Sequence, residues 1–136
     1  MRINKDTKLF ISLSSKPSNF GTLIYNECFK RYNLNCIYKS FGSLNIKESI
    51  NAVRSLEIAG CSVSMPFKER VMDYLDEIDP IALKLNSVNT IKNVSGRLKG
   101  YNTDSYGAKK LISIIIKNPF IFLKLNIFNK IKKNKI

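Results

Sequence analysis

The order of the short apolar runs constrains this chain more than any other feature, because strand-like and helix-like runs alternate along it. Three short runs have the composition of buried strands: 9–13, 36–41 and 61–64. Between them, apolar residues recur at helical spacing over 22–32, where Thr22 is a suitable cap, and over 46–59, which Gly60 would end. A strand–helix–strand–helix–strand order predicts an α/β domain whose sheet is mostly parallel and flanked by helices.

The next segment continues this order with short helices. One helix should follow Lys68 and end near Leu75, and Asp79 before Pro80 marks the start of another. Within the elements predicted so far, five apolar side chains are expected in the core: Phe10, Ile37, Phe41, Val53 and Leu56.

Two further strand-like runs, 88–94 and 97–102, flank Ser95 and Gly96. Two turn residues ending in glycine between strands predict a β-hairpin, which adds one antiparallel strand to the sheet. A last helix is expected over about 104–117, where Asn-Pro follows.

The net charge of +13 is concentrated at the C-terminal end. Up to Asp104 the chain carries fifteen basic and ten acidic residues, a net charge of +5, and the other eight basic residues all follow it without an acidic residue among them. We therefore expect residues 1–117 to form one folded domain and 118–136 to be a basic, Lys/Ile/Asn/Phe-rich tail that is poorly ordered. The apolar residues of this tail are interrupted too often to give the roughly 18 consecutive apolar residues of a membrane span.

Cysteine and histidine usage narrows the chemistry. The chain has three cysteines without a CxxC spacing and no histidine, so we expect no metal site. An odd cysteine count without a signal peptide favours a reducing, cytoplasmic location. Proton transfer near neutral pH would fall to a lysine, a carboxylate or a cysteine.

Four blocks in one register carry a family resemblance. They read Ser14-Ser-Lys-Pro-Ser-Asn-Phe-Gly-Thr22, Gly60-Cys-Ser-Val-Ser-Met-Pro-Phe-Lys-Glu69, Ser87-Val-Asn-Thr90 and Gly100-Tyr-Asn-Thr-Asp104. Their order and spacing, with Leu75-Asp-Glu-Ile-Asp-Pro80 between them, resemble the N-terminal, substrate-binding domain of the shikimate dehydrogenase family. The first loop resembles the shikimate dehydrogenase-like branch of that family, and the similarity covers about Asp6 to Leu111.

The resemblance implies an NADP-dependent oxidoreductase of the chorismate pathway of aromatic amino acid biosynthesis, which interconverts 3-dehydroshikimate and shikimate. In that family the N-terminal domain holds the small polyol acid and a C-terminal Rossmann domain holds the nucleotide. The branch resembled by the first loop also leaves open a substrate other than shikimate.

By the same resemblance Lys68 and Asp104 match the catalytic lysine and aspartate. Oxidation of a secondary alcohol removes a proton from oxygen while a hydride leaves carbon, and a lysine–carboxylate pair suits that proton transfer. Taken alone, Lys68 would be read as a solvated surface residue, and Asp104 as the N-cap of the following helix.

The resemblance also assigns polar contacts to the substrate. Those matched to the ring hydroxyls are Asn89, Thr103 and Ser64, and those matched to the carboxylate are Ser18 and Thr22, with Ser14 as an alternative. Hydroxyl and amide groups supply the donors and acceptors that a polyol needs. The competing readings are that Asn89 is a turn residue and that Ser18 and Thr22 cap the first helix.

No cofactor-binding residues are expected in the chain itself. Its six glycines are isolated, and no two make the GxG of a pyrophosphate-binding turn. We therefore expect a chain that stops before the NADP-binding domain and would need a separate nucleotide-binding chain as partner. Two other readings stay open: a non-catalytic remnant or binding module that keeps the fold, and a carrier of a basic tail for nucleic acid or anionic membrane. We expect no specific nucleic-acid binding.

Overall fold

The computed structural model describes residues 3–117, and the tail predicted over 118–136 lies outside them. Helices and strands follow one another in the order β1 (Lys8–Ser14), α1 (Asn19–Arg31), β2 (Cys36–Gly42), α2 (Ile46–Ser55), β3 (Gly60–Val63), the 3₁₀ helix η1 (Arg70–Tyr74), β4 (Glu77–Ile78), α3 (Pro80–Lys84), β5 (Thr90–Val94), β6 (Arg97–Tyr101) and α4 (Thr103–Lys117). The chain forms two compact units, one ending at Asn102 and one beginning with α4.

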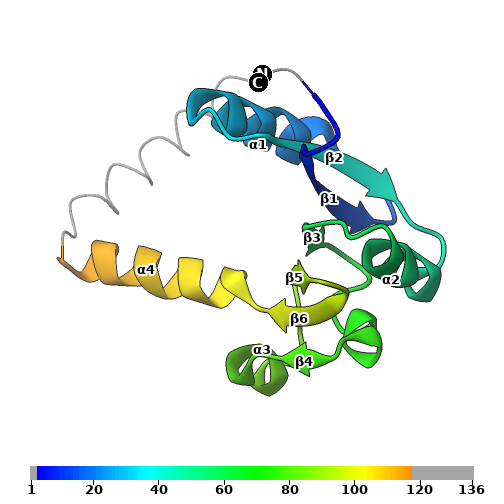
Figure 1. Ribbon diagram of the computed structural model, residues 1–136. Helices are drawn as coiled ribbons and strands as arrows, with labels where there is room; N and C mark the ends of the chain where they lie inside the picture. Colours follow the sequence, from blue (N-terminus) through cyan, green and yellow to red (C-terminus); the bar gives the residue numbers. More distant parts are fainter. Residues whose placement is uncertain (1–2, 118–136) are drawn as a thin grey trace, which may run out of the picture. The chain divides into compact units, whose positions relative to one another are not determined.

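The strands of the first unit form one six-stranded sheet in the order β2-β1-β3-β5-β6-β4 (Figure 1). β1 pairs in parallel with β2 and β3, and β4 pairs in parallel with β6. β5 is antiparallel to both of its neighbours. This confirms the predicted mostly parallel sheet with one antiparallel hairpin strand. The two-residue strand β4 was not predicted, because two residues carry no readable periodicity.

One face of the sheet carries the apolar core. Alternate residues of the central strands point to this face, where α2, η1 and α3 cover them. The strand residues buried there include Ile11, Leu13, Cys61, Val63 and Ile91. From α2 they meet Ile46, Ile50 and Val53, three residues at helical spacing with at most 3% of their surface exposed.

The opposite face is covered by α1 over β1 and β2, and this contact is aromatic. Phe29 packs against Phe10 with ring centroids 5.6 Å apart, and Tyr25 stacks on Tyr38 at 4.6 Å. A side chain at Gly60 would have its Cβ 2.9 Å from the Phe10 ring, so glycine is required where β3 begins beside β1. Helix α1 itself has no fully buried residue.

Of the five expected core residues, only Val53 is buried. Phe10 and Ile37 are half-buried, and the prediction is wrong for Phe41, which is 43% exposed, and for Leu56, which is 71% exposed. Phe41 lies near the end of β2, which is an edge strand, and Leu56 is the C-cap of α2. Amphipathic spacing continues through Leu56 in the sequence, but the helix has already ended there.

The predicted helix ends also need correction. Helix α2 ends at Ser55 rather than at Gly60, because Glu57 adopts a left-handed backbone with φ 50°. The N–H of Ile58 then bonds the carbonyl of Val53 at 3.1 Å, which closes a Schellman motif and buries the Ile58 side chain. Asn33 and Asn86 end α1 and α3 in the same way, so none of these three helices uses glycine at this position.

Two helices differ from the prediction, one in where it begins and one in its helix type. Helix α1 begins at Asn19, so Thr22 lies inside it and is not its cap. The segment after Lys68 forms a 3₁₀ helix rather than an α-helix. In contrast, the entry to α3 is as predicted, with the Asp79 side chain accepting a hydrogen bond from the N–H of Ile81 at 2.9 Å.

The β5–β6 hairpin has the predicted two-residue turn and is held by an arginine. Ser95 and Gly96 both have positive φ, 50° and 82°, as the preferred hairpin turn requires. Arg54 of α2 donates to the Gly96 carbonyl and, at 2.6 Å, to the Asp76 carboxylate. The Leu98 N–H and the Arg54 guanidinium, both bonded to that carboxylate, lower the pKa of Asp76. The hairpin is thereby tied to α2.

Burial predicts a marked difference in thiol reactivity. Desolvation raises the pKa of the Cys61 thiol to about 12, whereas Cys28 is exposed. At pH 8 a disulfide reagent should modify Cys28 at once and Cys36, which is half-buried, more slowly. Cys61 should react only on unfolding. A Cys28→Ser chain should lack the fast phase, and rapid labelling of Cys61 in the native chain would contradict this core.

The raised pKa of Cys61 also determines how its contribution to folding stability changes with pH. A free thiol ionises near about pH 8.5, so the unfolded chain loses the Cys61 proton before the folded chain does. Between roughly pH 8.5 and 12 the folded state therefore binds more protons, and the contribution of Cys61 to stability falls as pH rises.

Candidate functional site

Polar residues of three blocks come together at one edge of the sheet. β1 and β3 are parallel and end at this edge, and β5, antiparallel to β3, begins there. Backbone hydrogen bonds tie the loops to one another: Ser64 N–H to the Leu13 carbonyl at 2.9 Å, and Val63 N–H to the Asn89 carbonyl at 2.8 Å. Main-chain hydrogen bonds thus fix the backbone of these segments at the edge, and with it the positions of their side chains.

Lys68 is placed by the loop that follows β3. The loop turns sharply, with the N–H of Phe67 bonded to the Ser64 carbonyl at 3.0 Å and a cis peptide between Met65 and Pro66. Phe67 is 5% exposed and anchors the loop in the core. The Lys68 carbonyl accepts from the N–H of Val88 at 2.8 Å, so the backbone of this half-buried lysine is fixed beside the start of β5.

Asn89 is one of two buried polar residues in the described part of the chain, with 8% of its surface exposed. Its N–H donates to the Tyr101 carbonyl at 3.0 Å, and its side-chain oxygen accepts from the Thr90 hydroxyl at 2.9 Å. The turn reading therefore does not describe Asn89, which lies between two strands and is tied to both. Ser64, Lys68 and Asn89 are the predicted site residues that the sheet brings to one edge.

The first loop uses its hydroxyl groups differently. Ser14 is the last residue of β1, and Ser18 is the exposed N-cap residue of α1, whose side chain makes no capping hydrogen bond. Thr22 lies within α1, with its hydroxyl oxygen 3.0 Å from that of Ser40 and accepting from the Ser40 N–H at 3.3 Å. The Thr22 hydroxyl therefore joins α1 to β2, and a role in holding a carboxylate stays a prediction.

Thr103 and Asp104 belong to the second unit. Thr103 is the first residue of α4 and Asp104 lies in its first turn, so Asp104 is not the cap residue. A carboxylate in the first turn is favourably placed toward the positive end of the helix dipole. That Asp104 faces Lys68 stays a prediction.

Sequence reasoning missed Asn26, which locks α1 to the edge strand. Its side-chain NH₂ donates to the Tyr38 carbonyl at 2.8 Å and to the Thr22 carbonyl at 2.7 Å. Its oxygen accepts from the Tyr38 N–H at 2.9 Å. The Asn26 amide thus bonds both the N–H and the carbonyl of Tyr38, on the side of β2 that has no neighbouring strand. The available signal was an asparagine in the middle of a helix, where this residue type is unfavourable without a special partner.

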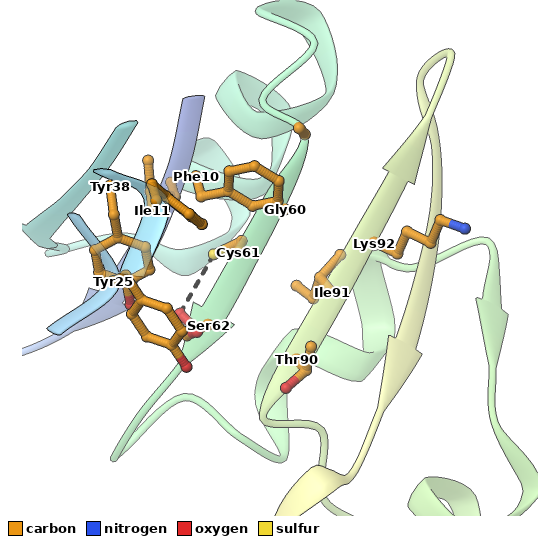
Figure 2. Close-up of a pocket in the computed structure, with 12 residues that line it drawn as sticks. Phe10, Ile11, Tyr25, Tyr38, Gly60, Cys61, Ser62, Thr90, Ile91 and Lys92 are labelled. Carbon is orange, nitrogen blue, oxygen red and sulfur yellow. Dashed lines mark hydrogen bonds between the residues drawn. The ribbon is translucent and has the colours of Figure 1, made fainter. Parts of the chain in front are cut away.

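A pocket of about 310 Å³ lies on the α1 side of the sheet (Figure 2). Its walls are mostly aromatic and aliphatic side chains of β1, α1 and β2, together with the β3–β5 pair. Figure 2 shows Ser62 and Thr90 at the same end of this pocket, from β3 and β5.

Within residues 3–117, no three histidine, cysteine or carboxylate side chains are grouped as a metal site would need, and no helix is long and apolar enough to cross a bilayer.

Comparison with known proteins identifies the family to which these features belong. Residues 18–91 match the family model of the shikimate dehydrogenase substrate binding domain. A Haemophilus influenzae protein named shikimate dehydrogenase-like protein is 54% identical over 110 residues, which cover 81% of this chain and 41% of that protein.

Solved structures agree on the fold. A shikimate 5-dehydrogenase-like protein superposes with a TM-score of 0.82 and 51% identity, over 86% of this chain and 44% of its own. A shikimate dehydrogenase solved in complex with NADP⁺ gives a TM-score of 0.78 and 37% identity, over 85% and 41%. The chain thus spans about two fifths of the length of these relatives.

The Asn26 bridge can be tested by substitution. Asn26→Ala removes three hydrogen bonds and leaves the main chain of Tyr38 to water or to no partner, so we expect a loss of about 1–3 kcal/mol in the free energy of unfolding. The exposed neighbour Glu27→Ala should change it by less than about 0.5 kcal/mol. Urea denaturation followed by circular dichroism measures both, and equal effects would contradict the bridge.

Proposed function

Because this chain belongs to the shikimate dehydrogenase family through its substrate-binding domain, we propose that it binds shikimate, or a similar cyclic polyol acid, at the edge that carries Ser64, Lys68 and Asn89. The observation that supports this most is the hydrogen bond from the Val88 N–H to the Lys68 carbonyl. It holds the backbone of Lys68 beside Val88, whose next neighbour in the chain is the buried Asn89. An ammonium, an amide and a hydroxyl at one edge match the oxygens of a polyhydroxylated acid.

In this proposal the ring hydroxyls are bound by Asn89, Thr103 and Ser64. The substrate carboxylate lies at the first loop, where Ser18 and Thr22 supply hydroxyl groups and Ser14 is the alternative. Since the Thr22 hydroxyl is already bonded to Ser40, a carboxylate there would share it or displace that bond.

Lys68 and Asp104 are proposed to handle the proton. When shikimate is oxidised, the 3-hydroxyl would lose its proton to this pair, and the hydride on the same carbon would pass to a two-electron acceptor, by family resemblance NADP⁺, held outside residues 3–117. Lys68 would hold the alcohol oxygen, and Asp104 would orient the ammonium and share the proton. These roles require the two side chains to meet across the substrate.

The described residues do not fit NADP. A dinucleotide site needs a glycine-rich turn between a strand and a helix, which lets the main chain approach the pyrophosphate. The β1–α1 turn is Ser15–Ser18 and the β2–α2 turn is Ser43–Asn45, both without glycine. We therefore assign no nucleotide contact to residues 3–117, and propose that the nucleotide is held by a separate domain or chain.

A second candidate is a binding module without turnover. The match of residues 18–91 to a substrate-binding domain supports ligand binding in both candidates. Both candidates bind the same ligand, and only catalysis separates them. A cytoplasmic location stays a prediction.

Binding can be measured first. Without a second domain closing over the ligand, we expect a dissociation constant near the millimolar range, about 4 kcal/mol of binding free energy. Shikimate titrated into the ¹⁵N-labelled chain should shift the signals of Asn89 and Thr103. Asn89→Ala and Asp104→Ala should weaken binding about tenfold or more, whereas Asn51→Ala, on an exposed position of α2, should not. Shifts confined to 118–136 would refute the site.

Turnover is the second test. Placing the nicotinamide against the substrate carbon contributes on the order of 7–11 kcal/mol to lowering the barrier, and residues 3–117 show no element that could do so. The 136-residue chain alone should therefore not reduce NADP⁺ in the presence of shikimate.

Adding a Rossmann domain from a complete relative should separate the two candidates. Recovered activity should fall by about 10²–10⁴-fold in Lys68→Ala and Asp104→Ala but stay unchanged in Lys84→Ala, an exposed lysine of α3. Activity indifferent to Lys68 and Asp104 would refute their roles, and no recovered activity despite shikimate binding would favour the binding module.

A further inference from the structure

A row of hydroxyl-bearing residues crosses five strands in register. The pairings between neighbouring strands run, in order across the sheet, Ser40, Ser12, Ser62, Thr90 and Tyr101. All five are half-buried. They lie on the α1 side of the sheet, because their neighbours in sequence, such as Ile11, Cys61 and Ile91, point to the core.

Two members of this row each hold a residue of the proposed site. The Ser40 hydroxyl lies 3.0 Å from that of Thr22, and the Thr90 hydroxyl donates to the Asn89 side-chain oxygen at 2.9 Å. The second bond bears directly on the chemistry. With its oxygen accepting from Thr90, the Asn89 amide has its plane held and its NH₂ group turned away from that hydroxyl.

Resting on the proposed function, we infer that Thr90 is a positioning residue for the substrate site: it holds the Asn89 amide so that the NH₂ group donates to a ligand oxygen. Thr90 itself acts through Asn89. An amide held in one orientation loses less rotational freedom when the ligand binds, so the gain appears as affinity.

The fold supports a rigid Thr90. It is the first residue of β5 and is paired on both sides, with Ser62 of β3 and with Tyr101 of β6. Being β-branched, threonine has few side-chain rotamers in a strand, so its hydroxyl direction is set by the backbone. Figure 2 shows Thr90 facing Ser62 across the β3–β5 pair, which makes Ser62 a matched control.

The test uses the full 136-residue chain and three substitutions. Thr90→Val keeps the shape and the strand preference but removes the hydroxyl, Thr90→Ser keeps the hydroxyl, and Ser62→Ala removes the facing hydroxyl of the same row. One ordinary hydrogen bond corresponds to about a three- to tenfold change in an equilibrium constant, so Thr90→Val should weaken shikimate binding by about that factor. Thr90→Ser and Ser62→Ala should each stay within about twofold of the unchanged chain.

A second readout needs no ligand. The side-chain NH₂ signals of Asn89, identified by their loss in Asn89→Ala, should shift in Thr90→Val, which lacks the hydroxyl donor to the Asn89 oxygen, and return in Thr90→Ser. Unchanged Asn89 signals together with unchanged affinity in Thr90→Val would overturn the inference, as would equal losses in Thr90→Val and Ser62→Ala. If Thr90→Val fails to fold, Thr90→Ser compared with Thr90→Ala decides in its place.

The two readouts separate this inference from the proposed function. If the unchanged chain does not bind shikimate, the proposed function fails, while the Asn89 signals of the ligand-free chain still show whether Thr90 holds the amide. If shikimate binds and Thr90→Val changes neither signal nor affinity, the proposed function stands and the positioning role falls.

Discussion

The pairing of β3 with β1 on one side and β5 on the other is the constraint on which the candidate site depends. β3 has only four residues, yet it joins the parallel half of the sheet to the hairpin. Parallel pairing brings the ends of β1 and β3 to one edge, and antiparallel pairing brings the start of β5 to the same edge. The loop carrying Lys68 and the strand start carrying Asn89 meet only because both pairings hold.

The two faces of this sheet have different tasks. The core face is apolar from β1 to β6 and is covered by α2, η1 and α3, so burial of hydrocarbon supplies most of the stability there. The α1 face carries the row of hydroxyls and the aromatic contacts of α1. The α1 face is therefore mixed, with hydroxyl groups in register beside aromatic rings, and the strands packed on the apolar core fix the positions of those hydroxyl groups.

Several predictions from local pattern were wrong for one physical reason, which is that helix ends are decided by packing. Spacing of apolar residues extended the second helix to Ala59, but the chain leaves the helix at Leu56 so that Ile58 can enter the core. The left-handed residue this requires is Glu57, which local preference does not favour. Asn33 and Asn86 serve the same purpose at the ends of α1 and α3, where glycine would have been the readable signal.

The sequence by itself determined the order of the main helices and strands, the hairpin turn at Ser95 and Gly96, and the blocks that identify the family, because each is written in neighbouring residues. Only the tertiary structure decided which strands pair and in what register. That register aligns Ser62 with Thr90, and the packing of α1 on β2 bonds Asn26 to Tyr38 and Thr22 to Ser40. These contacts join segments far apart in the chain, and the energy that selects them comes from packing the whole sheet rather than from any one segment's own preference.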